Sequence, residues 1–166
     1  MKTLVFISKN IDSYKFLKYI LNKYFSFDLD KSLLKKNIYG KPYIPNFDFN
    51  FNISHSDDLL IIAFNKDIIG VDCEVVSDID ESISDIYLRD KRLWTIYESY
   101  IKAIGKGLYI DTKKICIDST NNTISSEGYP TMYYATNIID NNYVSICTFN
   151  KINQIDIFRE VLVENG

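Results

Sequence analysis

The sequence of 166 residues contains only three cysteines, and they are widely spaced at Cys73, Cys116 and Cys147. Each lies inside an apolar run of the kind that forms β-strands. An odd number of cysteines at such spacing argues against a disulfide framework and against a cysteine-based zinc site. We therefore expect all three to be small, buried hydrophobic residues.

Long hydrophobic runs are also missing from the sequence. No segment approaches the roughly 18 uncharged apolar residues that a membrane helix needs. The apolar run at residues 3–7 is broken by Ser8, Lys9 and Asn10, which is too early for a signal peptide. The apolar share of 46% and aromatic share of 14% are typical of globular proteins. We expect a cytoplasmic protein without a membrane partner, folded as one domain or as two small halves packed together.

Charge is unevenly distributed along the chain. The net charge of −3 argues against a general nucleic-acid binder. Residues 1–43 carry nine lysines and three acidic residues, whereas residues 44–166 have a net charge of −9. The basic front segment would suit an anionic small molecule or an acidic protein partner. An ordinary solvated, lysine-rich helix face explains it about as well.

The apolar pattern predicts helices and strands in both halves of the chain. Apolar residues at three- and four-residue steps predict a helix over 11–25, capped by Asp12 or Ser13, and polar residues 26–37 leave room for a short second helix. The tight Asn65-Lys66-Asp67 connection is typical of an antiparallel hairpin. The last segment, 155–163, fits a strand edge or a short helix. The predicted strands cover residues 3–7, 59–64, 68–74, 113–118, 132–139 and 143–149.

The stretch from Trp94 to Leu108 predicts the helix around which the rest of the chain is organised. At 3.6 residues per turn, Trp94, Glu98 and Lys102 lie in one row, so the last two project side by side. Gly105 and Gly107 tolerate positive φ and end the helix. Taken alone, the Glu98–Lys102 pair is more simply interpreted as an exposed salt bridge worth about 0.3–0.5 kcal/mol.

Two further acidic residues lie upstream, in the strand-like run that contains Asp72 and Glu74. Side chains alternate along a strand, so these two carboxylates share one face. They repel each other unless a positive charge lies between them. Lysines and backbone amides can satisfy such acids, and so can a metal ion.

Four motifs in order resemble those of the 4'-phosphopantetheinyl transferases, in particular the larger, monomeric type that activates surfactin synthetase. The resemblance covers roughly residues 38–108. The motifs are Gly40-Lys41-Pro42, Asn52-Ile53-Ser54-His55-Ser56, Gly70-x-Asp72-x-Glu74, and Trp94-x-x-x-Glu98-x-x-x-Lys102 followed by Gly-Lys-Gly-Leu. The resemblance implies an α+β fold of two similar halves, about 1–75 and 76–166. Each would be a helix packed on a small antiparallel sheet, the two related by a pseudo-twofold axis with the active site in the cleft between them.

The resemblance also implies a reaction and a set of site residues. The enzyme would transfer the 4'-phosphopantetheine arm of coenzyme A to a serine of an apo acyl or peptidyl carrier protein, with release of 3',5'-ADP. The carriers would be acidic proteins of fatty acid, polyketide or nonribosomal peptide synthesis. Asp72, Glu74 and Glu98 would hold Mg²⁺ on the pyrophosphate of the coenzyme, because three carboxylates make a hard oxygen site.

Five side chains receive further roles from the resemblance. Glu98 would also accept the proton of the serine, and Lys102 would bind the coenzyme and meet the charge that develops on its phosphates. Lys41, Ser54 and His55 would contact the phosphates. From the sequence alone, His55 is also consistent with a hydrogen-bonded loop residue, and Lys41 with simple surface charge.

The sequence departs from the family pattern at several points. Tyr97 stands where a lysine is usual, Val75 stands where a lysine or arginine is common, and the segment 75–94 is short. These departures keep two alternatives open. One is a degenerate homologue that binds coenzyme A or a carrier protein without transfer. The other is a plain interaction domain whose acidic residues are ordinary surface charges without a role in a site.

Overall fold

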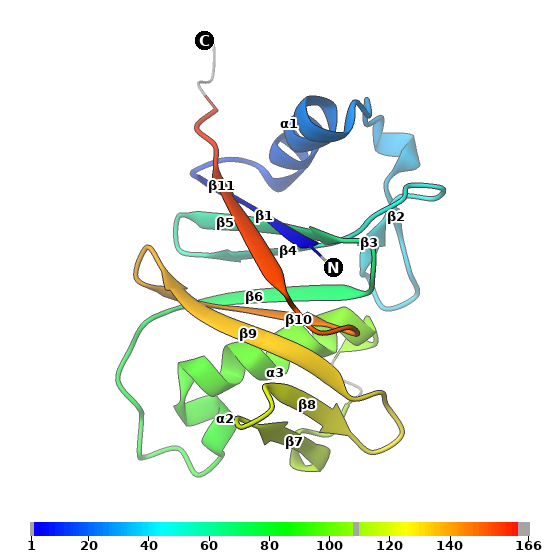
Figure 1. The fold of residues 1–166 in the computed structure, drawn as a ribbon. Coiled ribbons are helices and arrows are strands. Elements are labelled where there is room, and N and C mark those ends of the chain that lie inside the picture. Colours follow the sequence, from blue (N-terminus) through cyan, green and yellow to red (C-terminus); the bar gives the residue numbers. More distant parts are fainter. Residues whose placement is uncertain (1, 108–109, 163–166) are drawn as a thin grey trace.

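The computed structural model describes residues 2–107 and 110–162, and it stacks two β-sheets between two helices (Figure 1). The first sheet has the strand order β11-β1-β5-β4 and the second has the order β6-β10-β9-β8-β7. The strands of the first sheet are β1 (Lys2–Lys9), β4 (Asn50–Ser56), β5 (Leu59–Asn65) and β11 (Gln154–Arg159). Those of the second sheet are β6 (Ile69–Val75), β7 (Ile115–Asp118), β8 (Thr123–Ser126), β9 (Met132–Ile139) and β10 (Asn142–Thr148).

The helices and a small hairpin complete the fold. The helices are α1 (Ser13–Phe25), α2 (Ile86–Arg89) and α3 (Lys91–Ile104), with 3₁₀ turns η1 (Lys31–Leu33) and η3 (Thr112–Lys114). Strands β2 (Lys35–Lys36) and β3 (Pro42–Tyr43) pair with each other. Two predicted segments end at Leu108 and Val163, which lie outside the described residues.

Helix α1 covers the outer face of the first sheet. Its N-cap is Asp12, whose side chain accepts a hydrogen bond from the backbone N–H of Lys15. The buried face of the helix packs against the aromatic and aliphatic side chains of β1 and β5, among them Phe6 and Phe64. The apolar periodicity therefore predicted this helix correctly, to within two residues at its start.

Helix α3 covers the second sheet in the same way. Asp90 caps its start by accepting from the N–H groups of Arg92 and Leu93, and Gly105 ends it with φ of 73°. Tyr97, Tyr100 and Ile101 pack into a cluster with residues of β8, β9 and β10. The helix predicted from the sequence is thus confirmed, and it begins three residues earlier than Trp94.

The inner faces of the two sheets pack on each other. Val5, Ile61 and Val71 belong to this middle core, which joins β1 and β5 of the first sheet to β6 and β10 of the second. Strand β5 is buried at all seven positions because both of its faces are covered. The result is a four-layer α+β arrangement, and the pseudo-twofold relation between its halves stays a prediction.

Strand pairing differs from the predicted hairpin. Strand β5 pairs with β1 and β4, whereas β6 pairs with β10 in the other sheet. The short connection at residues 66–68 therefore carries the chain between sheets. Strand β11 pairs in parallel with β1, which settles the undecided C-terminal segment as a strand. Strand β6, which ends at residue 75, belongs to the second sheet, and β11 near the end of the chain belongs to the first. The two sheets are therefore not formed one from residues before 75 and the other from residues after it.

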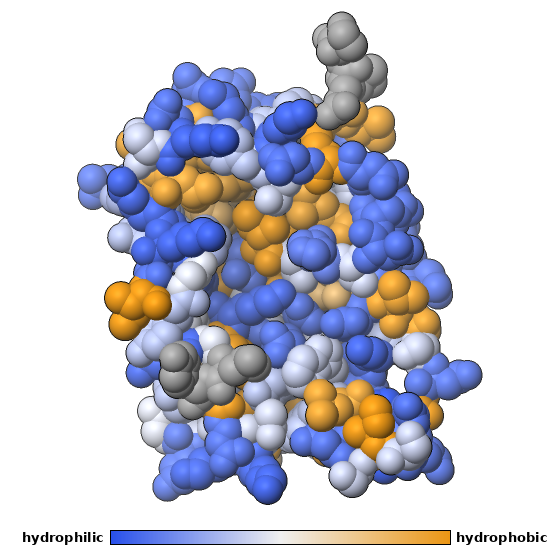
Figure 2. Space-filling model, turned by 180° about the vertical axis from the view of Figure 1, so that it is seen from behind, coloured by the Kyte–Doolittle hydropathy of each residue, from blue (hydrophilic) through white to orange (hydrophobic). Residues whose placement is uncertain are grey.

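The surface is mainly polar in the view from behind, with hydrophobic groups in separate places (Figure 2). Cys116 is exposed, so the expectation that all three cysteines are buried holds only for Cys73 and Cys147. The exposed hydrophobic side chains include Ile38 and Val161. Scattered exposure of this kind is normal for globular proteins. Over the described part of the chain, no helix has the length and apolar character needed to cross a membrane.

Gly70 lets helix α3 lie directly on strand β6. A Cβ atom at this position would sit 2.0 Å from the carbonyl oxygen of Ser99 and 2.4 Å from the backbone nitrogen of Ala103. Backbone atoms cannot move aside as a flexible side chain can. The glycine thus sets the distance between the helix and the strand.

Substitution of Gly70 by alanine should push α3 away from β6 and lower the free energy of unfolding by about 2–3 kcal/mol, toward the upper part of the range for overpacked cores. Urea denaturation followed by circular dichroism measures this change. The control is Ile68→Ala, an exposed position just before β6, which should change stability by less than about 0.5 kcal/mol. A G70A protein as stable as the wild type would contradict the close packing described here.

Candidate active site

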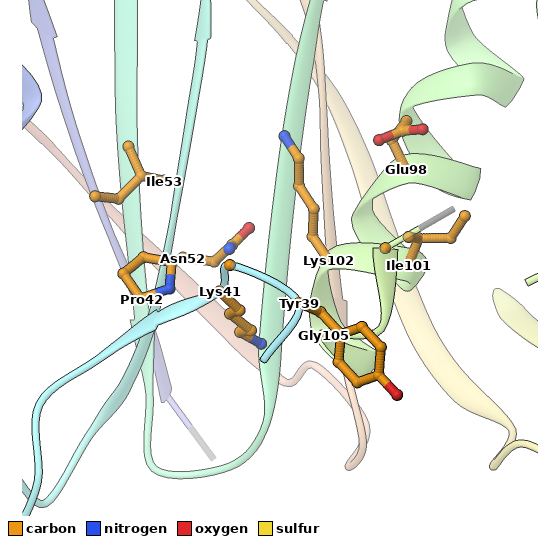
Figure 3. A pocket seen from close by; sticks show the side chains of 11 residues that line it. Tyr39, Lys41, Pro42, Asn52, Ile53, Glu98, Ile101, Lys102 and Gly105 are labelled. Carbon is orange, nitrogen blue, oxygen red and sulfur yellow. The ribbon is translucent and has the colours of Figure 1, made fainter. Parts of the chain in front are cut away.

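A cavity of about 270 Å³ lies between the C-terminal half of α3 and the turn that precedes β3 (Figure 3). Glu98 and Lys102 line it from the helix, and Lys41 and Asn52 line it from the opposite side. The cavity is slightly smaller than typical small-molecule sites, so it has room for part of a coenzyme-sized ligand.

Beside this cavity, three elements meet at one buried carboxylate. Asp72 on β6 is 6% exposed, and its Oδ1 atom accepts hydrogen bonds from Lys102 Nζ at 2.6 Å and from Ser54 Oγ at 3.2 Å. Ser54 Oγ in turn accepts from the backbone N–H of Cys73 and from Lys102 Nζ, each at 3.2 Å. Strand β4, strand β6 and helix α3 are therefore joined through the side chains of Ser54, Asp72 and Lys102.

Charge in this cluster is only partly balanced. Burial raises the pKa of Asp72, and the Lys102 ammonium opposes that rise. The other carboxylate oxygen of Asp72, Oδ2, is buried and has no hydrogen-bond partner among the described residues. A buried oxygen of this kind is costly unless something satisfies it.

Glu98 and Glu74 lie close enough to add to this negative charge. Burial raises the pKa of Glu98, and the charges of Asp72 and Glu74 raise it further. Glu74, near the end of β6, is partly exposed and lies 3.6 Å from Lys91 Nζ. The three acidic residues singled out in the sequence thus influence one another electrostatically.

The donor types suit a hard cation, but the described residues do not form a ready ligand set. Within residues 2–107 and 110–162, no group of three histidine, cysteine, aspartate or glutamate side chains is arranged to hold a metal ion. Lys102 supplies the positive charge beside Asp72 instead. Carboxylate oxygens are ligands that suit Mg²⁺. In the arrangement of the described residues, Lys102 supplies part of the positive charge that a metal ion would bring to Asp72.

Lys41 lines the cavity, but its ammonium group points into the protein, toward the backbone of β6 and α3. Its Nζ donates to the backbone oxygens of Ile69 at 3.0 Å and Ala103 at 2.9 Å. Burial lowers the pKa of Lys41 to about 8. The lysine therefore binds main-chain carbonyls of β6 and α3 rather than standing as surface charge.

The structure does not bring His55 into the cluster. It is exposed on β4 and follows Ser54 directly, so its side chain points to the opposite face of the strand. Ser54 is 4% exposed and bonded to Asp72, Cys73 and Lys102.

Two asparagines complete the site, and the motifs had assigned no role to either. Asn52 is buried on the same strand face as Ser54, and its Oδ1 accepts from the backbone N–H of Val71 at 2.9 Å. Asn37 donates from Nδ2 to the backbone oxygen of Gly105 at 3.0 Å. The alternation that pairs Asn52 with Ser54 was visible in the sequence, whereas nothing local pointed to Asn37.

No family model matches the chain. Curated proteins do match it. The 4'-phosphopantetheinyl transferase gsp of Aneurinibacillus migulanus is 36% identical over 148 residues, covering 75% of this chain and 62% of that protein. The 4'-phosphopantetheinyl transferase Sfp of Bacillus subtilis is 39% identical over 103 residues, covering 49% of this chain and 46% of that protein.

A further relative is the 4'-phosphopantetheinyl transferase ffp of Bacillus subtilis, 40% identical over 89 residues that cover 42% of this chain and 40% of that protein. The chain thus spans between 40% and 62% of the length of these curated relatives. Their shared name agrees with the family indicated by the four motifs. The chain is a homologue of these 4'-phosphopantetheinyl transferases over the part of their length that it matches.

Proposed function

We propose that the protein transfers the 4'-phosphopantetheine arm of coenzyme A to a serine hydroxyl of an apo acyl or peptidyl carrier protein. The serine oxygen forms a bond to the β-phosphorus, and the bond from that phosphorus to the leaving 3',5'-ADP breaks. The observation that carries the proposal is the meeting of Glu98 and Lys102 with buried Asp72 at the edge of a cavity. The names of the homologues support the same reaction.

Glu98 is the group proposed to accept the proton of the attacking serine. Burial and the neighbouring negative charges raise the pKa of its carboxyl group, which makes the carboxylate a stronger base than an exposed glutamate. It also lines the cavity, where the carrier's serine would meet the coenzyme. No covalent intermediate on the enzyme is needed for this step.

Lys102 is proposed to meet the charge that develops on the phosphates. Its side chain is 29% exposed, and it lines the cavity while bonding to Asp72. A fixed cation at such a position favours a transition state with more negative charge than the ground state. The pairing with Asp72 holds the ammonium in place.

Mg²⁺ would be held by Asp72, Glu74 and Glu98 in this proposal. Support comes from the hard oxygen donors, from their mutual repulsion and from the unpaired Oδ2 atom of Asp72. A bound Mg²⁺ would polarise the phosphate and neutralise the leaving group. The protein's own contribution would be to supply the carboxylates of Asp72 and Glu74 from β6 and that of Glu98 from the facing part of α3, near enough to affect one another electrostatically.

Phosphate contacts by Lys41, Ser54 and His55 remain part of the proposal. Lys41 Nζ and Ser54 Oγ already bond to groups within the protein, so a direct contact requires them to share or release those bonds. His55 is exposed and lies outside the cluster of Ser54, Asp72 and Lys102, so a phosphate contact by its side chain would be made away from that cluster. The best-placed cation for the coenzyme is therefore Lys102.

A non-catalytic homologue is the second candidate, and Tyr97 is the residue to weigh. Tyr97 is 1% exposed, and its ring packs near those of Trp94 and Tyr87 at centroid distances of 5.2 and 5.8 Å. The tyrosine thus fills the core beneath α2 instead of joining the polar cluster. Its presence leaves Glu98 and Lys102 in position, which favours the catalytic alternative.

The direct test incubates the purified protein, assayed as a monomer, with coenzyme A, Mg²⁺ and a panel of apo carriers from fatty acid, polyketide and peptide synthesis. At least one carrier should gain a single phosphopantetheine arm, seen by intact-protein mass spectrometry. Binding of coenzyme A without modification of any carrier would select the non-catalytic homologue. Neither binding nor transfer would leave only the interaction domain.

Replacing Glu98 by glutamine should lower kcat by about 10²–10⁴-fold, the usual contribution of a positioned acid–base group. The thermal midpoint should not fall, because removing one of three mutually repelling carboxylates relieves electrostatic strain. Steady-state kinetics and a thermal melt give the two readouts. Glu127→Gln, an exposed change at the ion pair with Lys114, serves as the matched control and should keep full activity. Wild-type turnover in E98Q would remove Glu98 from the mechanism.

Mg²⁺ should raise the thermal midpoint of the wild-type protein, because a ligand that binds only the folded state stabilises it, by about 2.7 kcal/mol at a hundred times its dissociation constant. Asp72→Asn should abolish this effect while the protein stays folded. Asp118→Asn, at a half-buried aspartate at the end of β7, is the control and should respond to Mg²⁺ like the wild type. An unchanged Mg²⁺ response in D72N would rule out Asp72 as a ligand.

A further inference from the structure

The C-terminal end of α3 is capped by side chains from a distant part of the chain. The last carbonyl groups of a helix have no partners within it and must be satisfied from outside. Here Lys41 Nζ donates to the oxygen of Ala103 at 2.9 Å, and Asn37 Nδ2 donates to the oxygen of Gly105 at 3.0 Å. The cation also lies beside the negative end of the helix dipole, where positive charge is favourable.

The turn that carries these two side chains is itself closely hydrogen-bonded. Asn37 Oδ1 accepts from the N–H groups of Tyr39 and Lys41, each at 2.9 Å. The backbone N–H of Asn37 donates to the oxygen of Lys41 at 2.9 Å, and that of Gly40 donates to the oxygen of Asn37 at 3.0 Å. Gly40 has φ of 88°, which suits glycine in such a turn. One side chain, Asn37, therefore both closes the turn and joins it to α3.

The same turn joins the helix to strand β6. Lys41 Nζ also donates to the oxygen of Ile69, one residue before the glycine on which α3 rests. At the end of the helix, a Cβ atom on Gly105 would lie 2.9 Å from Lys41 Cδ and 3.3 Å from Asn37 Nδ2. The contacts are thus tight from both sides, and there is little room for the end of α3 to shift.

We infer that Asn37 and Lys41 are positioning residues that hold the end of α3 in place, so that Lys102 stays on Asp72 and Glu98 stays at the cavity. Lys102 directly precedes Ala103, and the carbonyl oxygen of Ala103 accepts a hydrogen bond from Lys41. The Nζ atom of Lys102 in turn donates to Asp72 Oδ1 at 2.6 Å. The catalytic part of this inference rests on the proposed function. For Lys41, this positioning role replaces the phosphate contact that the proposed function carries over from the motif.

We call the contacts of Asn37 and Lys41 with the end of α3 the brace. Two variants distinguish the brace from a phosphate contact by Lys41. Lys41→Met keeps an unbranched side chain that is one atom shorter and removes the hydrogen bonds to Ile69 and Ala103. Asn37→Asp keeps the acceptor oxygen that closes the turn, removes the donor to Gly105 and places a negative charge beside that carbonyl oxygen. The matched controls are Lys36→Met, an exposed lysine of the same hairpin, and Asn153→Asp, an exposed asparagine before β11.

The first readout is amide hydrogen exchange, which needs no enzymatic activity. The N–H of Gly105 bonds to the oxygen of Ile101, so its exchange reports on the last turn of α3. In both K41M and N37D, exchange over residues 101–105 should become about tenfold faster, as expected for loss of one hydrogen bond. Exchange in α1 should be unchanged, and both controls should match the wild type.

The second readout is the split between kcat and KM for coenzyme A. A brace predicts that kcat falls about tenfold in both variants, since misplacing catalytic groups by an ångström is costly, while KM changes by less than about twofold. A phosphate contact predicts a raised KM in K41M, with kcat and exchange unchanged and N37D like the wild type. That pattern would overturn the inference, as would normal exchange in both variants.

The two readouts keep this inference separate from the proposed function. If the wild type modifies no carrier, the exchange experiment still decides whether the turn braces α3, and only the catalytic part is lost. If K41M does not fold, N37D carries the test, because it retains the lysine and the hydrogen bonds within the turn. Faster exchange with normal kcat would reduce the turn to a purely structural element and contradict its role in positioning.

Discussion

The site depends on one partly buried ion pair, between the buried carboxylate of Asp72 and the ammonium of Lys102 at 2.6 Å. A buried charge is tolerated only when it is paired and hydrogen-bonded, and a well-packed apolar pair would often be at least as stable. The pair is therefore weak as an explanation of stability. It makes sense as part of a polar site, because Ser54 is bonded to the same ammonium and the other carboxylate oxygen of Asp72 has no partner among the described residues.

The ion pair also explains how three carboxylates can remain together in a folded protein before any ligand arrives. Lys102 offsets the charge of Asp72 and lowers the repulsion felt by Glu98. A divalent cation at the same place would take over part of that neutralisation and leave the lysine freer to meet phosphate. Helix α3 carries both the acid and the lysine, so the close contact of α3 with β6 at Gly70 governs all of these distances together.

Local periodicity was enough to predict which groups share a face, and little more. Row spacing on a helix placed Glu98 beside Lys102, and alternation along a strand placed Asp72 with Glu74. The partner of β6 was beyond reach, because strand pairing is decided by burial on both faces and by contacts distant in sequence. The predicted hairpin failed for this reason: β5, covered on both sides, takes β1 and β4 as neighbours and leaves β6 to the other sheet.

The direction of the Lys41 side chain was another feature that no pattern could supply. Lys41 looked like a solvated or phosphate-binding lysine, yet its ammonium lies between two main-chain oxygens of β6 and α3. His55 belongs to the same motif as Ser54 but faces the other side of the strand. For Lys41 the deciding factor is a nonlocal need: helix α3 ends with unpaired carbonyls, and donors from the turn at residues 37–41 reach them.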